Sequence, residues 1–228
     1  MTFIIIFVIL LSQHYFKFAI NAPWRTSALS YIWSGWQKLA TALSLDKNPG
    51  SNALGFIVLA MLVVVILHHL LGFVAAFVLL WFSLDAYPGS DRPNEAGYRL
   101  RHLFAIWFWF VVLGIYPAML YVAIVLAIEQ LPGLKSVTWY VQILSLLEWI
   151  PARLLGLSLG LVSSLMPVFV QWLKDLRLGL TSQERLLNNW AELALKADAD
   201  ASLQGLLARA GLLWLVILAL LSIGAYVV

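Results

Sequence analysis

The sequence predicts an all-α, polytopic integral membrane protein with about four or five transmembrane helices and further amphipathic helices at the membrane surface. Hydrophobic residues make up 63% of the 228 residues, charged residues make up 11%, and the mean hydropathy is +0.92. A soluble domain is about half apolar and about a quarter charged. A soluble chain of this size could not bury so much apolar surface, so we expect the lipid bilayer to be its main partner.

Charge and cysteine usage exclude several classes of function. The formal net charge is only +3 and no long basic run occurs, so nucleic acid is not an expected partner. Cysteine is absent, which excludes disulfides, thiolate metal sites and cysteine nucleophiles. The four histidines are scattered along the chain. We therefore predict no metal, no cofactor and no catalytic residue.

The first 50 residues predict N-terminal interfacial helices. An apolar run at 2–11 is short for a span, has no Lys or Arg before it and no clear cleavage site after it. We interpret it as a retained, half-inserted or interfacial helix. Residues 26–45 have helical periodicity, and their apolar face predicts either a helix lying in the membrane interface or one packed on the bundle. That face carries Ile32, Trp36, Leu39 and Leu43.

Residues 53–128 predict membrane spans on either side of a polar loop at 85–102. One helix over 53–82 would be about 45 Å long, which exceeds the ~30 Å hydrocarbon core. Two short helices in a tight hairpin near 68–72 are therefore favoured over one protruding helix. The histidines at this point, His68 and His69, would lie at the turn.

A second apolar stretch at 104–128 predicts one span that opens with a dense group of aromatic residues. Gly114 and Pro117 are expected to kink it, because both residues weaken helical hydrogen bonding.

Residues 139–167 predict a helix with a stripe of small side chains. Pro151 fits the first turn of a helix, and helix continuing through it would place Glu148 in the same seam. Small residues at every fourth position allow close helix packing, either within the chain or between two copies as a homo-oligomer. The stripe consists of Ala152, Gly156, Gly160 and Ser164.

The last third predicts a soluble amphipathic helix at 171–200 and a C-terminal span at 203–228, all within a single membrane domain. Residues 181–184 match a capping box. Basic residues outnumber acidic ones before the first strong span, which places that segment in the cytoplasm. The charges concerned are Lys17, Arg25, Lys38 and Lys47 against Asp46.

Glu148 and Arg153 are the best candidates for binding a ligand or partner, with Pro151 between them. A charge buried near a membrane is costly and usually has a partner or a role. The alternative is structural, with the two residues pairing with each other or with the polar loop. Arg99 and Arg101 predict either an anion site shared with Arg153 or ordinary anchoring on the positive side of the membrane.

Residues 147–154, with the sequence LEWIPARL, resemble the Asp/Glu-aromatic-Ile/Val-Pro-x-Arg-Leu motif of the AmpE and CobD/CbiB membrane protein superfamily. Trp109, Gly114 and Tyr121 are similar to the preceding span of that family. Residues 181–183, followed by an amphipathic helix and a final span, are most similar to AmpE. This resemblance implies a bacterial inner-membrane signalling modulator without its own catalysis, linked to peptidoglycan recycling, β-lactamase induction and protein partners of that system.

The CobD/CbiB branch, whose members form an amide bond in cobinamide synthesis, implies the alternative function. Its pattern places an arginine after the tyrosine, but Val122 follows Tyr121 here and the helix stays apolar up to Glu129. The Ala-Glu-Asn loop of that branch is missing as well, since Asn94 and Glu95 occur in reverse order. A small transporter or channel subunit is disfavoured further, because few charges fall in span centres.

Overall fold

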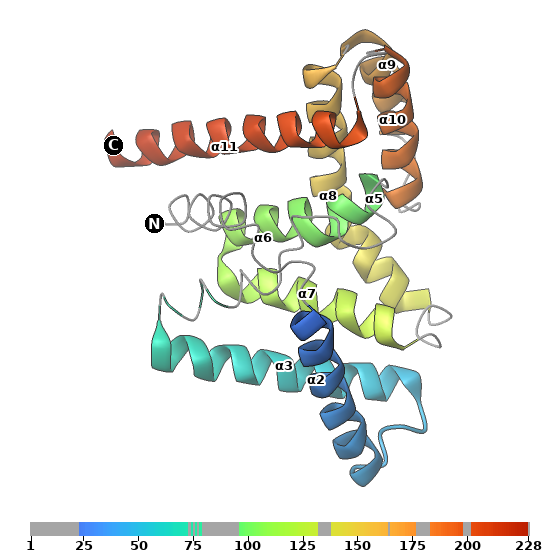
Figure 1. Ribbon diagram of the computed structural model, residues 1–228, viewed down its shortest axis with the longest axis vertical. Helices are drawn as coiled ribbons and strands as arrows, with labels where there is room; N and C mark the ends of the chain where they lie inside the picture. The colour runs from blue at the N-terminus through green and yellow to red at the C-terminus, as the bar shows by residue number, and fades with distance from the viewer. Residues whose placement is uncertain are drawn as a thin grey trace.

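The computed structural model describes residues 23–72, 74, 76, 78, 96–131, 138–163, 165–176, 183–197 and 202–227, and its regular structure there is entirely helical. The prediction of an all-α fold is thus confirmed. Predictions for 2–11, for Ser164 and for the first half of the capping box lie outside these residues. The helices, labelled in Figure 1, are α2 (Pro23–Ala42), α3 (Pro49–Leu71), α5 (Ala96–Arg99), the π-helix η1 (Leu100–Phe104), α6 (Ala105–Leu113), α7 (Ile115–Gln130), α8 (Thr138–Val162), α9 (Leu165–Asp175), α10 (Gln183–Ala197) and α11 (Leu203–Val227).

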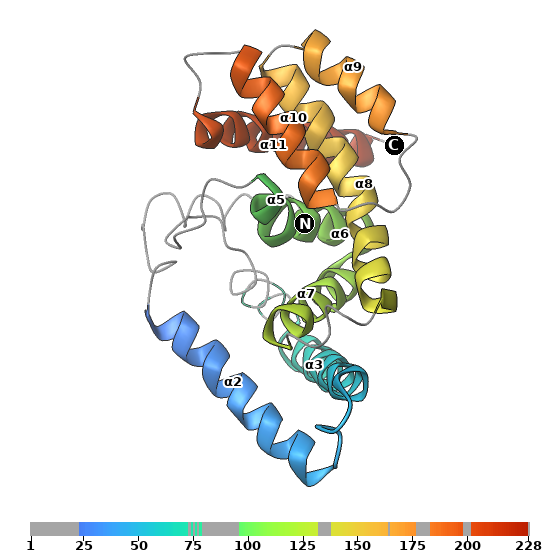
Figure 2. The same cartoon turned by 90° about the vertical axis from the view of Figure 1, so that its right-hand side faces the viewer.

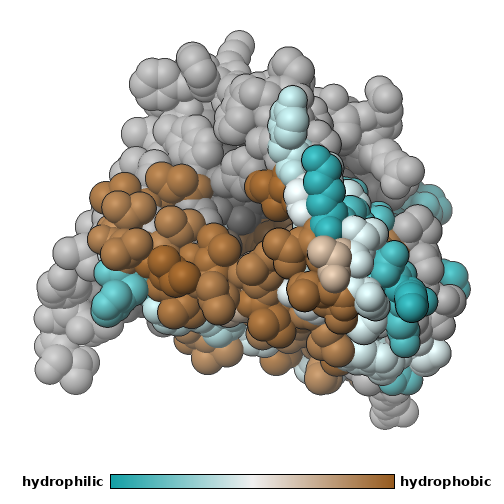
Figure 3. All heavy atoms as spheres, turned by 90° about the horizontal axis from the view of Figure 1, so that it is seen from below, coloured by the Kyte–Doolittle hydropathy of each residue, from teal (hydrophilic) through white to brown (hydrophobic). Residues whose placement is uncertain are grey.

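Three of the described helices are long and apolar enough to cross a membrane: α3, α8 and the first 18 residues of α11. Large apolar side chains are exposed around α3 and on α11, as expected for surfaces that contact lipid. Seen from below, the described surface is mostly hydrophobic on one side and hydrophilic on the other (Figure 3). These features indicate a multi-pass membrane protein.

Helix α3 is continuous from Pro49 to Leu71 and begins four residues before the predicted start at residue 53. The Asn48 side chain accepts a hydrogen bond from the Gly50 amide at 2.9 Å, and Pro49 occupies the first turn, where its missing N–H has no consequence. The helix ends at Gly72, whose φ of +52° favours glycine. This end falls in the predicted break at 68–72. Most of the second helix of the predicted hairpin, which would follow Gly72, lies outside the described residues.

The prediction of one kinked span over residues 104–128 is wrong, because α6 and α7 fold back on each other at Gly114 (Figures 1 and 2). Gly114 has φ +89° and ψ −165°, and its amide donates to the Phe110 carbonyl at 3.0 Å. The reversal brings His102 Nε2 within 3.1 Å of Glu129 Oε1. In one continuous helix these residues would be about 40 Å apart.

Helix α2 packs on α3 through Trp36, which is buried and donates from Nε1 to Asn52 Oδ1 at 2.6 Å. The other apolar residues of the predicted face stay exposed, so the face is only partly covered by the bundle. They are Ile32, Leu39 and Leu43.

Helices α8, α9 and α10 pack together, and the small-residue stripe of α8 lies in their interface. A Cβ on Gly156 would overlap the ring of Trp190 in α10, and one on Gly160 would touch Val168 in α9. The described part of the stripe therefore serves close packing within one chain. Helix α11 crosses α8 and places Trp214 against Phe104, with a centroid distance of 5.4 Å.

Candidate functional site

A buried carboxylate on α8 joins the α6–α7 hairpin to the rest of the molecule. The Glu148 side chain is 3% exposed and receives Arg101 Nε on Oε1 at 2.7 Å and Arg101 Nη2 on Oε2 at 3.3 Å. The hydroxyl of Tyr121, which is fully buried, donates to the same Oε1 at 3.2 Å. A carboxylate bound on both oxygens by one guanidinium is a strong, charge-assisted pair. We call Arg101, Tyr121 and Glu148 the glutamate cluster.

Local backbone structure explains how these three side chains meet. Arg101 and His102 lie in the π-helix η1, which precedes α6. A π-helical turn has wider hydrogen bonding than an α-helix and often occurs at functional sites. Tyr121 lies on α7, and the hairpin brings it beside η1. Arg101 in η1 and Tyr121 in α7 thus both face the buried side of α8 at Glu148.

Contacts continue from this cluster to the start of α10. Arg101 Nη2 lies 3.6 Å from Glu184 Oε2, and the Gly97 amide donates to Asn188 Oδ1 at 3.1 Å. A Cβ on Gly97 would overlap Glu184, so the glycine lets α5 approach α10 closely. The arginine therefore holds both a buried and a partly exposed carboxylate.

Arg153, one and a half turns along α8, belongs to a separate group of side chains. Its Nη1 donates to Gln183 Oε1 at the start of α10, and its Nη2 lies 3.4 Å from the Asp175 carbonyl oxygen. The guanidinium lies over the rings of Trp149 and Trp190, at 5.0 and 5.8 Å from their centroids. Stacking on aromatic faces suits the planar, weakly hydrated guanidinium.

Asp175 completes this second group, which we call the arginine cluster. Its carboxylate accepts hydrogen bonds from Trp190 Nε1 at 2.9 Å and from Gln171 Nε2 at 3.0 Å. Trp172 Nε1 donates to the Arg153 carbonyl at 3.0 Å. No sequence pattern marks Asp175 as a site residue, since it is the last residue of α9, where a short polar stretch begins. Only the tertiary fold identifies its partners.

The structure divides the predicted site residues between these clusters. Glu148, Arg101 and Tyr121 meet in one, while Arg153 lies in the other. The side chain of Arg99 lies outside the described residues. The prediction that Pro151 occupies the first turn of a helix is wrong, because α8 begins at Thr138 and Pro151 lies inside it. The helix continues through the proline, so Glu148 and Ala152 share its buried side.

The arrangement is suited to holding helices together and presenting α10. Within the described ranges, no group of three or more His, Cys, Asp or Glu side chains is placed to hold a metal ion. Each oxygen of Glu148 already accepts a hydrogen bond from the protein. Comparison with protein-family models, curated proteins and solved structures gives no match for this chain.

Proposed function

We propose that the protein is an AmpE-like signalling modulator of the bacterial inner membrane, which acts by binding a protein partner and not by its own catalysis. The proposal combines the resemblance of residues 147–154 to the superfamily motif with the contacts that this motif makes. One observation supports it most directly: both charged residues of the motif act on the first turn of α10. Glu148 holds Arg101 beside Glu184, and Arg153 binds Gln183.

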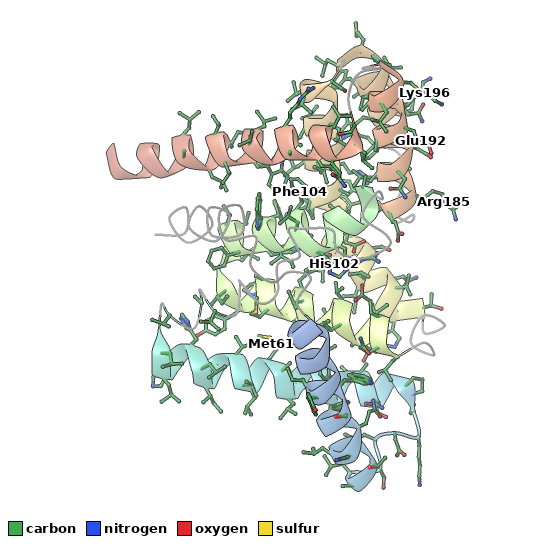
Figure 4. The ribbon with its side chains drawn as sticks, in the orientation of Figure 1. Met61, His102, Phe104, Arg185, Glu192 and Lys196 are labelled. Carbon is green, nitrogen blue, oxygen red and sulfur yellow. The ribbon has the colours of Figure 1, made fainter. Side chains whose placement is uncertain are left out.

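The contacts of Glu148 and Arg153 hold α10 in place, and the exposed side of α10 is the surface that would bind the partner. Its polar residues recur at intervals of three or four along the helix, opposite the buried side that contains Trp190. In Figure 4 the labelled side chains of α10, Arg185, Glu192 and Lys196, point away from the other helices. A charged, solvated helix face is suited to a protein partner of complementary charge. The exposed residues are Arg185, Asn189, Glu192 and Lys196.

This surface is assigned to the cytoplasm. The segment before α3 is basic, which favours the cytoplasmic side for the start of α3. The Tyr140 hydroxyl near the start of α8 donates to the Gly50 carbonyl at 2.8 Å, so the first turns of α8 and α3 lie on the same side. Glu129, at the end of α7, contacts His102 on that side too.

The test is β-lactamase induction in cells in which the chromosomal copy has been replaced by variants. A triple charge reversal, Arg185→Glu with Glu192→Lys and Lys196→Glu, should change induction by a β-lactam as much as deletion does. Asp46→Lys, a charge reversal at an exposed position that keeps the segment before α3 basic, is the matched control and should behave as wild type. Wild-type induction in the deletion strain would overturn the proposal.

The purified protein distinguishes this role from amide ligation. Ligands that bind only the folded state raise the melting temperature by mass action. We expect no shift with ATP plus a cobinamide precursor. A shift of several degrees that disappears in Glu148→Gln would favour the ligase branch of the superfamily.

A further inference from the structure

Helices α3 and α8 are similar in length, with 23 and 25 residues, and both are apolar enough to cross a membrane, but they run in different directions. In Figure 1 α3, α6, α7 and α11 run across the picture, while α8 runs along its long axis. In Figure 2 α3 is seen close to end-on, and α8 still runs along the long axis. Transmembrane helices tilt by about 20° on average, with a range of about 0–40°. Helices that cross in this way cannot both span one bilayer.

Between the two, α3 has the properties of the spanning helix. Its 23 residues would extend about 34 Å. They carry exposed apolar side chains on more than one side, such as Leu59, Val63 and Val65. Helix α8 instead buries Glu148 and Arg153 near its middle. A charge at the bilayer centre is costly, so the middle of α8 is a poor position for the bilayer centre.

From Leu146 to the end of α8, every exposed residue is nevertheless a large apolar one, whereas Thr138 and Gln142 near its start are exposed and polar. The exposed residues of this apolar part are spaced by four, four and seven positions, which places them on one side of the helix. Helix α9 packs beside α8 and also has exposed apolar side chains, namely Leu165, Met166, Val170 and Leu173. We call these exposed residues the α8–α9 apolar stripe. Its α8 members are Leu146, Ile150, Leu154 and Leu161.

Helix α10 gives the same assembly a polar side. It packs on α8 and turns Arg185, Glu192 and Lys196 outward (Figure 4). An apolar surface on one helix pair and a charged surface on the helix packed against it is the pattern of an assembly that lies in the membrane interface. A charged helix packed along a membrane-spanning helix would lie inside the bilayer, which is unfavourable.

We propose that α8 and α9 lie along the cytoplasmic membrane surface, with the α8–α9 apolar stripe in contact with lipid at the boundary between headgroups and acyl chains. Both polar clusters then lie at the level of the membrane surface. There their charges avoid the bilayer centre, and α10 is exposed to water. This inference rests on the membrane character of the chain and does not depend on the proposed signalling role.

Site-directed spin labelling tests this placement, because the chain contains no cysteine that would have to be removed. Single cysteines at Leu146, Ile150, Leu154 and Leu161 are labelled with a nitroxide in lipid nanodiscs. The matched set on α3 is Val58, Leu62 and Ile66. Immersion depth is measured from the ratio of collision rates with oxygen and with a water-soluble nickel complex. All of these positions are exposed, so folding should be retained and is checked by the melting temperature.

We expect the four α8 labels to have one shallow depth, while depth changes with position along α3. A depth that rises and then falls along α8, as for a spanning helix, would overturn the proposal. So would α8 labels that are as accessible to the nickel complex as a label at Lys196 on α10, because the stripe would then face water. Neither result depends on β-lactamase induction, so this test can fail independently of the proposed function.

Discussion

The glutamate cluster and the arginine cluster lie on the same helix, five residues apart, yet they hold together different parts of the molecule. Glu148 faces the α6–α7 hairpin and binds residues from η1 and α7. Arg153 faces α9 and α10, where it contacts Gln183 and Asp175. The comparison shows that one short motif joins the apolar α6–α7 hairpin to the polar helix α10. A motif with this role needs both charges even where it performs no reaction.

The two clusters also differ in how their charge is compensated. Glu148 is neutralised mainly by one opposite charge, Arg101. Arg153 contacts a neutral amide, a carbonyl oxygen and two indole rings, with the Asp175 carboxylate as a nearby opposite charge. Removing one partner of a buried ion pair leaves an uncompensated charge, which costs more than the loss of one neutral hydrogen bond. The glutamate cluster should therefore be the more sensitive of the two.

The largest effect is expected for Glu148→Ala. It leaves Arg101 without its main counter-charge and Tyr121 without an acceptor, at a cost of about 3–5 kcal/mol. The melting temperature should fall by roughly 10 °C at this chain length. Tryptophan fluorescence in nanodiscs measures it, since the chain has 11 tryptophans. Glu192→Ala, on the exposed side of α10, is the control and should melt as wild type.

A double variant sharpens this result. Arg101→Met with Glu148→Leu removes both charges and restores apolar packing, which is often close to neutral for a buried pair. We expect it to recover most of the lost melting temperature. If the double variant is as unstable as Glu148→Ala, the broken Arg101–Glu148 ion pair is not the cause of the lower melting temperature.

The next effect tests the packing behind the arginine cluster. Gly156→Ala places a methyl group against the buried ring of Trp190 and should cost about 1–3 kcal/mol by overpacking. Gly211→Ala on α11 is the matched control, because nothing lies near its added Cβ. An alanine in a helix is better than glycine by up to about 1 kcal/mol, so the control should be neutral or stabilising. Equal melting of the two variants would exclude close packing as the role of the stripe.

Asp175→Asn should have a smaller effect. The carboxylate accepts from both Trp190 and Gln171, and an amide must turn its NH₂ group toward one of these donors. The lost hydrogen bond should cost about 1–2 kcal/mol. Hydrogen exchange should become faster in α10 and stay unchanged in α7 if the two clusters are independent. Asp46→Asn, at an exposed position, is the control, and faster exchange in α7 would contradict the separation.

The sequence predicted the helical fold, a break near 68–72, where α3 ends at Leu71, and the burial of charge near Pro151. Helical periodicity and composition predict these features, because both are properties of residues that are close to one another along the chain. The resemblance selected Tyr121, which periodicity alone would have assigned to the core. Arg101 was selected for its charge, and the structure placed it beside Glu148.

Three features could not be predicted, and each depends on contacts between distant segments. Gly114 and Pro117 indicate a weakness in a helix, but the choice between a kink and a reversal is decided by packing of α6 on α7. The 25 residues of α8 have the length of a span, and only its direction relative to α3 suggests otherwise. Asp175 accepts a hydrogen bond from Trp190, fifteen residues later in the chain, and no local pattern specifies this pairing.

The smallest expected effect decides whether the two clusters communicate. Glu184 is 41% exposed and lies 3.6 Å from Arg101, so Glu184→Gln should cost at most about 1 kcal/mol, and less at high salt. This contact is nevertheless the direct link from the glutamate cluster to α10. In a double-mutant cycle with Asp175→Asn, independent clusters give additive changes within about 0.3–0.5 kcal/mol. A larger interaction energy would mean that α10 senses both clusters together, and that its exposed face responds to changes in the membrane hairpin.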